Sequence, residues 1–327
     1  MAGALPLFPT ITCVSSFPLP GQSASARRRR GSPLGSSAEN ANVDGIPPSL
    51  PDLRNHYYLL RHGQSTANVA GIISSARSLA GSDRHGLTLL GIEQSRNSAG
   101  QLIDAIARDL AEGDDGNGES PQPSRSTGQV YFVSSPFARA KETAEQCIRG
   151  IRRDEGVADR AESLGLTIHD EIHLHDGLME RYFGRLDGMD LSTYAYVWPV
   201  DMMDPTHTAF DVESVAEVCE RGESLSILRV SLANFSNSTL STDAHDRIDS
   251  VRGTILELES RYDGGGNHVV LASHADVLQI TQVYAVGLEN PGKFSSYRFG
   301  NGEVRAMKRS VGSLPEPVPL QPPKRGE

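Results

Sequence analysis

Two arginines and two histidines follow short apolar runs in three separate parts of the sequence. They are Arg61, His62, Arg139 and His274. A guanidinium presents forked donors that match phosphate oxygens, and a neutral imidazole nitrogen can attack phosphorus. Gathered in one crevice, these four side chains would hold a phosphoryl group and offer it a nucleophile.

The apolar runs predict the elements that bring these side chains together. Residues 57–60, 130–133 and 269–272 are continuous apolar runs, and the last two precede helical patterns at 137–151 and 277–286. Short apolar runs that alternate with helices are typical of buried strands in a mostly parallel sheet. Such sheets bind ligands beyond the carboxyl ends of their strands. We therefore expect one α/β domain, a three-layer α/β/α sandwich with a mixed, mainly parallel sheet.

The composition excludes several classes of protein. Hydrophobic residues make up 38% of the 327 residues, enough to bury a core, yet no apolar run of about 18 residues could span a membrane. The formal net charge of -10 disfavours a general nucleic-acid binder. We expect neither nucleic acid nor a membrane as a partner, and the oligomeric state stays open. Three distant cysteines exclude a disulfide scaffold, and Cys147 and Cys219 lie in helical patterns typical of a core.

The ends of the chain differ in composition from its middle. Residues 1–52 are rich in Ser, Pro, Ala and Arg and contain no acidic residue before Glu39. This favours a targeting peptide for a plastid, with a mitochondrial peptide, a signal peptide or a disordered extension of a cytoplasmic protein as alternatives. We expect the folded domain at 53–308, interrupted by a disordered insertion at about 111–129, and a Pro-rich extended tail at 309–327.

Five short motifs occur in a fixed order along the chain. They are Arg61-His62-Gly63 within Leu60–Asn68, Leu87-Thr88 with Gly91 and Gln94, Ser135–Ala140 with Thr143-Ala144, Leu178–Gly184, and Ser273-His274. Together they resemble the histidine phosphatase superfamily, the phosphoglycerate mutase-like group, over residues 55–304. The stretch from Glu180 to Ser214 is similar to plant phosphoglycerate mutase-like proteins of uncertain substrate.

The resemblance implies a role for each matched side chain. His62 would be the nucleophile that forms a phosphohistidine. Arg61, Arg139 and His274 would bind the transferring phosphoryl group, and Asn68 would be an additional donor. Preorganised cations can stabilise the charge on phosphoryl oxygens, so we expect no metal and no cofactor.

Glu180 is the carboxylate that the resemblance assigns to proton transfer. It would protonate the leaving alkoxide and then, as a base, activate water. The chemistry requires such a group, because the departing oxygen needs a proton.

Two positions depart from the family pattern. Ala275 follows His274 where the family usually has Gly, which adds a Cβ at a position that can require permissive backbone angles. Ala67 stands where mutases of this family commonly carry Trp, and this favours a phosphatase over a mutase.

A histidine-rich run offers a second candidate site. In an extended chain His169, Glu171, His173 and His175 share one face, which could suggest a metal site. No cysteine or second cluster completes a coordination shell, so a solvated face is the favoured interpretation.

The sequence thus favours a metal-independent phosphatase that hydrolyses a small phosphomonoester, a small phosphorylated metabolite, through a phosphohistidine at His62. A mutase that returns the phosphoryl group to the same substrate class and a non-catalytic phosphate-binding module stay open as alternatives. The cover that decides substrate specificity is expected at residues 185–211. Its candidate side chains are Tyr194, Tyr196, Trp198, Met202 and His207.

Overall fold

The structure is a computed structural model and describes residues 46, 49–112, 128–220 and 251–327. Most of the expected targeting peptide, Cys13 and residues 113–127 of the expected insertion lie outside the described residues. The first two residues of the expected insertion belong to a helix that ends at Glu112, and its last two belong to a strand that begins at Gly128.

A five-stranded sheet forms the centre of the fold, with strand order β3-β2-β4-β1-β5. Strands β1–β4, β4–β2 and β2–β3 pair in parallel, and only the pairing of β1 with β5 is antiparallel. The strands are β1 His56–Arg61, β2 Gly128–Ser134, β3 Leu166–Leu174, β4 His268–Ser273 and β5 Val304–Ala306. The three apolar runs of the sequence lie in β1, β2 and β4, so the predicted mixed, mainly parallel sheet is confirmed.

Helices cover both faces of this sheet. The α-helices are α1 Thr66–Ala70, α2 Leu89–Glu112, α3 Ala138–Arg153, α4 Glu155–Ser163, α5 Trp198–Met203, α6 Val215–Glu220, α8 Val251–Arg261 and α9 Ala275–Ala285. The 3-10 helices are η1 Arg77–Leu79, η2 Asp176–Leu178, η3 Gly184–Leu186, η4 Leu191–Tyr196, η5 Ala209–Asp211, η6 Pro291–Ser296 and η7 Val311–Ser313. In the described ranges, no helix combines the length and the apolar character that crossing a membrane requires.

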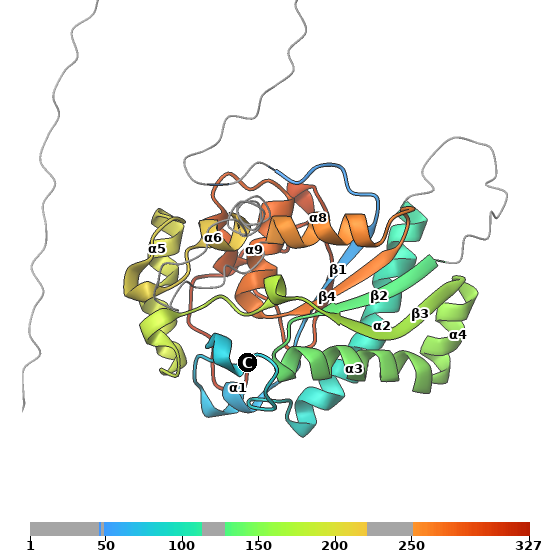
Figure 1. Ribbon diagram of the computed structural model, residues 1–327, viewed down its shortest axis with the longest axis horizontal. Coiled ribbons are helices and arrows are strands. Elements are labelled where there is room, and N and C mark those ends of the chain that lie inside the picture. The colour runs from blue at the N-terminus through green and yellow to red at the C-terminus, as the bar shows by residue number, and fades with distance from the viewer. Residues whose placement is uncertain (1–45, 47–48, 113–127, 221–250) are drawn as a thin grey trace, which may run out of the picture. The chain divides into compact units, whose positions relative to one another are not determined.

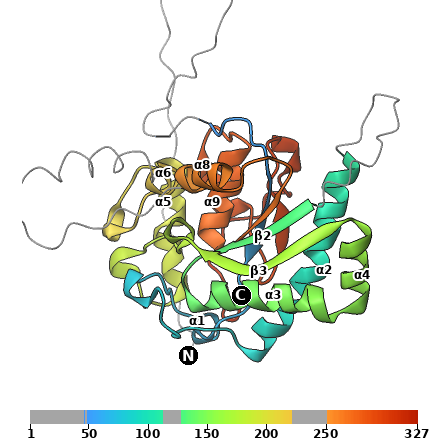
Figure 2. The ribbon, with the colours of Figure 1, turned by 45° about the vertical axis from the view of Figure 1, so that its right-hand side comes forward.

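Alternate side chains of the strands build two separate cores. Tyr57 and Leu59 of β1 pack with residues of α8 and α9, whereas Tyr58 and Leu60 pack with residues of α2 and α3. Successive strand side chains point to opposite faces, so a strand buried on both faces is apolar throughout. Figures 1 and 2 show α3 and α8 on opposite sides of the sheet. The predicted three-layer α/β/α sandwich is confirmed.

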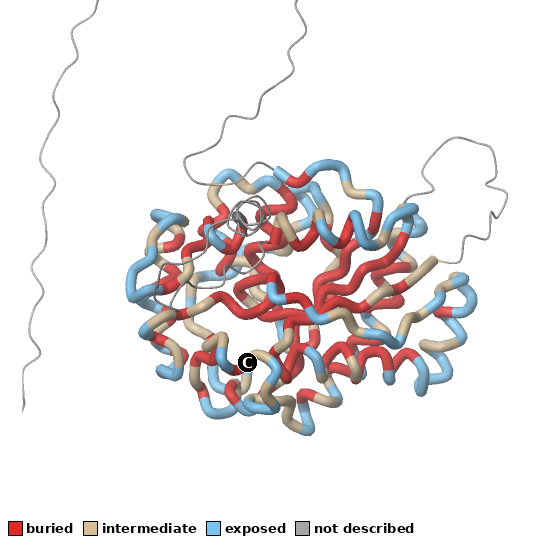
Figure 3. Tube along the Cα trace, in the orientation of Figure 1, coloured by how far each residue is buried: buried red, intermediate tan, exposed pale blue. Residues whose placement is uncertain are grey.

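Burial is greatest along the middle strands, as Figure 3 shows. Every residue of β4 is buried, and so is every residue of β1 after His56. Edge strand β3 contains no buried residue, which explains why its sequence is not a continuous apolar run. The rigid ends of β1 and β4 can therefore hold side chains in fixed positions.

The C-terminal residues differ from the prediction of a tail outside the domain. Their backbone is irregular, as expected for a Pro-rich segment, but Leu314 and Leu320 pack against the core cluster of α8 and α9. The N–H of Val318 donates to the carbonyl of Ser296 at 2.8 Å. Residues 309–327 thus belong to the folded unit.

Candidate active site

Strands β1, β2 and β4 end beside one pocket. Arg61 is the last residue of β1, His62 follows it, and His274 follows β4. Main-chain hydrogen bonds continue past the strand ends, from His62 N–H to the carbonyl of Ser273 at 3.0 Å and from Ser135 N–H to that of Ala272 at 2.9 Å. The pairing of the sheet thereby fixes the positions of all three segments.

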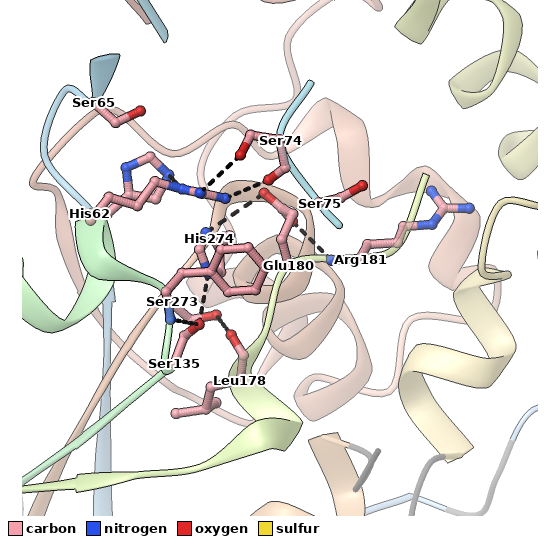
Figure 4. Close-up of polar contacts among 12 residues, drawn as sticks. His62, Ser65, Ser74, Ser75, Ser135, Leu178, Glu180, Arg181, Ser273 and His274 are labelled. Atoms are coloured by element: carbon pink, nitrogen blue, oxygen red, sulfur yellow. Dashed lines mark hydrogen bonds and ion pairs between the residues drawn. The ribbon is translucent and has the colours of Figure 1, made fainter. Parts of the chain in front are cut away.

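The structure brings the six predicted site residues together. Five of them line the pocket, namely Arg61, His62, Asn68, Arg139 and Glu180. His274 is fully buried behind them, with its ring centroid 5.2 Å from that of His62. In Figure 4, His62, Ser74, Glu180 and His274 lie around one centre.

The protonation of His62 follows from its two contacts. Its Nδ1 lies 2.8 Å from the carbonyl oxygen of Gly63, which can only accept, so Nδ1 carries the ring proton. Nε2 then holds the lone pair and accepts from Nε–H of Arg139 at 3.2 Å. Burial, followed by the charges of Arg139 and Arg61, lowers the pKa of His62 well below its usual value. The ring is therefore a neutral imidazole with an unprotonated Nε2.

Arg61 and Arg139 are buried cations that form no hydrogen bond or ion pair with a carboxylate in the residues the structure describes. Arg139 donates to the carbonyl of Ser74 at 2.8 Å and to its hydroxyl at 3.4 Å, and Arg61 donates to the carbonyl of Phe299 at 2.6 Å. Apart from the His62 ring, every hydrogen-bond acceptor of the two guanidiniums in the described part of the chain is a neutral oxygen. Glu180 attracts both charges without a hydrogen bond to either, and burial raises its own pKa toward the neutral form. Burying charges that are not fully paired is costly, so the two guanidiniums favour a bound anion.

The Arg61 guanidinium also keeps a free donor. Its Nε is buried and has no hydrogen-bond partner among the described residues. Burial lowers the pKa of Arg61 to about 10, so the group is still charged at neutral pH. A ligand oxygen would satisfy this donor.

His274 connects the end of β2 to Glu180. Its Nε2 lies 2.9 Å from the hydroxyl of Ser135, which itself accepts from the N–H of Phe137 at 3.3 Å. The other ring nitrogen, Nδ1, is buried without a hydrogen-bond partner among the described residues and lies 3.8 Å from Oε2 of Glu180. Burial and then the Arg139 charge lower the pKa of His274 well below its usual value, so this ring is also neutral.

Glu180 lies in the loop between η2 and η3 and is buried. Its Oε1 accepts from the N–H of Arg181 at 3.1 Å. Burial and then the carboxylate of Asp276 raise the pKa of Glu180, against the opposing charges of Arg139 and Arg61. A carboxyl group that keeps its proton near neutral pH can donate it to a departing oxygen.

Arg181 anchors the Glu180 loop, a role that the sequence analysis missed. Both side chains of the Arg181–Asp201 pair are fully buried, and two hydrogen bonds of 2.7 Å join them. Arg181 also donates to the carbonyl of Glu213 at 2.6 Å, and His207 contacts Asp201 at 2.8 Å. The sequence contained a signal for this role, because Arg181 stands in the Glu180 motif and Asp201 lies in the same stretch from Glu180 to Ser214.

Asn68 is oriented by the start of α1. Its Oδ1 accepts from the N–H of Ser65 at 2.9 Å and from the Ser65 hydroxyl at 2.7 Å. These two bonds assign the amide orientation and make Nδ2 the donor end of the side chain. In the structure it donates to the main-chain oxygen of Glu327, so a residue of the C-terminal segment occupies the predicted donor.

Ala275 causes no backbone strain. It is the first residue of α9, and it is not among the residues with positive φ. The additional Cβ therefore fits a helical conformation that any residue adopts.

Part of the predicted cover, residues 185–211, lies at the pocket. Tyr194 and Trp198 line it, whereas Tyr196 is 62% exposed. Met202 is half-buried, and His207 contacts Asp201. Pocket residues that were predicted neither for the cover nor for catalysis include Ser74, Asp276, Gln279, Arg298 and Glu327.

The histidine-rich run forms edge strand β3 and the residue after it. His169 contacts the side chain of Gln129 at 2.8 Å and stacks on Tyr131, and His175 contacts Glu257 at 3.1 Å. Over the described ranges, no group of three or more His, Cys, Asp or Glu side chains is arranged to hold a metal ion.

Comparisons with known proteins found matches among solved structures only, since no family model and no curated protein matches the sequence. A mycobacterial glucosyl-3-phosphoglycerate phosphatase in complex with VO3 is 18% identical, with 77% of this chain and 92% of that chain covered and a TM-score of 0.43. An alpha-ribazole phosphatase from Shigella flexneri is 19% identical, with 80% and 95% covered and a TM-score of 0.43. A phosphoserine phosphatase from Entamoeba histolytica is 18% identical, with 77% and 89% covered and a TM-score of 0.41. The fold and the site described above rest on this chain's own strands and side chains.

Proposed function

We propose that the protein is a phosphatase that hydrolyses a small phosphomonoester, without a metal, through a phosphohistidine at His62. One observation carries the proposal. Two buried guanidiniums, Arg61 and Arg139, form no hydrogen bond or ion pair with a carboxylate in the described residues, and Arg139 contacts the unprotonated Nε2 of a neutral imidazole. This combination supplies both a binding site for a phosphoryl dianion and a nucleophile for phosphorus.

The first chemical step transfers the phosphoryl group to the protein. Nε2 of His62 attacks phosphorus, a P–N bond forms, and the ester P–O bond breaks. Glu180 gives its proton to the departing oxygen, which leaves as an alcohol. Arg61 and Arg139 stabilise the charge on the phosphoryl oxygens during transfer.

The second step releases inorganic phosphate. Glu180, now ionised, takes a proton from a water molecule as the water oxygen attacks phosphorus. The P–N bond breaks and its electron pair returns to Nε2. The neutral Glu180 acid and the neutral His62 ring are thereby restored for the next cycle.

A mutase reaction is the second candidate that the sequence resemblance offers. Ala67 lines the pocket at the position where mutases of that family commonly carry Trp. We therefore favour hydrolysis. With a phosphoglycerate as substrate, free inorganic phosphate indicates hydrolysis and an interconverted monophosphate indicates transfer.

The proposal is tested by trapping the covalent intermediate. The protein is incubated with p-nitrophenyl phosphate and with a panel of phosphorylated metabolites, phosphate release is measured, and the phosphorylated residue is located by mass spectrometry. We expect an acid-labile phosphoryl group on His62, and we expect His62→Ala to lose both the label and turnover. His56→Ala, which changes an exposed histidine at the opposite end of β1, is the matched control. Wild-type phosphate release by pure His62→Ala protein would refute the assignment.

A further inference from the structure

A third arginine, Arg298, lies at the pocket beyond the proposed phosphoryl site. Its guanidinium lies 4.9 Å from the centre of the Trp198 ring, and its side chain is 25% exposed. It donates to the carbonyl of Gln321 at 2.6 Å, and Nη2 lies 3.9 Å from Oε2 of Glu327. Both polar partners of the guanidinium within the described ranges therefore belong to the C-terminal segment, residues 318–327.

Gln279 of α9 lines the same pocket and carries an unsatisfied donor. Its side chain is 1% exposed, and its Oε1 accepts from the N–H of Phe299 at 3.2 Å. This bond assigns the amide orientation and leaves Nε2 as the free end. Nε2 is buried and has no hydrogen-bond partner among the described residues. A buried donor without an acceptor is costly, and a ligand oxygen in the pocket would remove that cost.

The main chain of Phe299 joins these two side chains to the phosphoryl site. Its N–H donates to Gln279, its carbonyl accepts from Arg61 at 2.6 Å, and Arg298 is the preceding residue. A ligand whose phosphoryl group contacts Arg61 therefore has Arg298 and Gln279 within the same pocket.

A carboxylate of the chain itself lies next to Arg298 in the structure. The Glu327 segment is held by hydrogen bonds of 2.9 Å from Gln64 to the carbonyl of Gly326 and of 2.8 Å from Gly326 N–H to the carbonyl of Asn68. With this segment in place the cavity volume is about 50 Å³. Sites for small molecules commonly measure about 300–1,000 Å³. Glu327 lines this cavity beside Arg298, so an anionic group that binds Arg298 competes with the Glu327 carboxylate.

We propose that Arg298 and Gln279 form a subsite for a second anionic group of the substrate, and that Glu327 occupies it until substrate binds. The inference rests on the proposed function, because it assumes that the phosphoryl group of the substrate binds at Arg61. The substrate class is then a phosphomonoester that also carries a carboxylate. A carboxylate is chosen because the group that lies beside Arg298 in the structure is the carboxylate of Glu327. Displacement of Glu327 also frees Nδ2 of Asn68 for a phosphoryl oxygen.

The test compares substrates that differ only in the second charge. Phosphoglycolate, 3-phosphooxypropanoate and 4-phosphooxybutanoate are compared with ethyl, propyl and butyl phosphate. A charge-assisted hydrogen bond predicts that at least one acid has a kcat/KM about tenfold or more above its neutral partner. In Arg298→Gln we expect the KM of that acid to rise about tenfold while kcat and the neutral esters change less than about twofold.

Two further variants sharpen the result. Lys293→Gln removes an exposed cation of the neighbouring η6, and we expect it to leave the preference unchanged. Glu327→Gln removes the competing carboxylate, and we expect it to lower the KM of the acid. Equal effects of Arg298→Gln on acids and neutral esters, or no preference for any of the three acids, would overturn the subsite.

Binding measurements separate this inference from the proposed reaction. Calorimetric titration of His62→Ala with the same six compounds needs no turnover. Tighter binding of an acid than of its neutral partner, lost when Arg298→Gln is added, supports the subsite even if His62 proves not to be the nucleophile. Equal binding of acids and neutral esters overturns it even if His62 is the nucleophile.

Discussion

Arg139 donates its Nε–H to Nε2 of His62 at 3.2 Å, so the proposed nucleophilic atom and a proposed phosphoryl ligand contact each other directly. A phosphoryl dianion is a stronger acceptor for a guanidinium than a neutral imidazole is. When the anion arrives, Arg139 can exchange the ring for an oxygen, and Nε2 becomes free to attack. Substrate binding and exposure of the nucleophile are thereby coupled in one contact.

The first prediction concerns Glu180 as the proton donor. Glu180→Gln should lower kcat for an alkyl phosphate by about 10²–10⁴, because an alkoxide leaves poorly without a proton. With p-nitrophenyl phosphate, whose leaving group needs no proton, the first turnover should stay fast. Because the variant also lacks the base for water attack, rapid kinetics should show a burst of p-nitrophenol followed by slow turnover. Equal loss of the first turnover with both esters would contradict the assignment.

The second prediction concerns the pH dependence of stability. The raised pKa of Glu180, caused first by burial, means that the folded state holds this proton at pH values where the unfolded chain has lost it. Folding stability therefore falls as the pH rises from the ordinary glutamate pKa to the raised one. Glu180→Gln removes this dependence and should be more stable than wild type at pH 8, by on the order of 1–3 kcal/mol.

Denaturant unfolding of both proteins from pH 4 to pH 8 measures this difference. We expect it to shrink toward zero below the ordinary pKa, where both states of the wild type are protonated. Exposed Glu316→Gln is the control and should show no such trend. A constant difference at all pH values would mean that the amide changes packing rather than removing a buried charge.

The positions of the site residues could be predicted because local sequence determines them. Arg61, His62 and His274 stand where apolar strands end, and parallel strands end at one edge of a sheet. The contacts of Arg298 and Asn68 with residues 318–327 could not be predicted, because they depend on where an irregular segment packs. Ser74, which holds Arg139, was missed for the same reason, since neither its type nor its spacing indicates a contact 65 residues away. The plastid location and the targeting peptide stay predictions from residues 1–52.

The third prediction concerns the two buried guanidiniums. Arg139→Met should abolish phosphatase activity and raise the midpoint of thermal unfolding, because it removes a buried cation that forms no hydrogen bond or ion pair with a carboxylate in the described residues. Vanadate should stabilise the wild type against heat and should no longer stabilise the variant. The exposed Arg185→Met is the control and should keep the response to vanadate. A variant that loses stability and still responds to vanadate would contradict the role of Arg139 in anion binding.

The last prediction concerns the buried pair of Arg181 and Asp201, which holds the loop of Glu180. Asp201→Asn removes the closer of the two carboxylates that pair with Arg181, the other being Asp276 at 3.7 Å, and should cost about 3–5 kcal/mol of unfolding free energy. Replacing both residues, Arg181→Met with Asp201→Leu, should recover part of this stability, because it removes the buried Arg181 charge together with the Asp201 charge. The recovery is not complete, because buried Asp276 loses its ion pair of 3.7 Å with Arg181.

The double variant then separates stability from positioning. We expect it to fold yet to turn over alkyl phosphates more slowly than wild type, because Glu180 loses the anchor beside it, while its burst with p-nitrophenyl phosphate persists. The exposed pair of Arg185 and Asp211 is the control, since Asp211→Asn should change stability by less than about 0.5 kcal/mol. Full activity of a stable double variant on alkyl phosphates would show that the pair supports the fold without positioning Glu180.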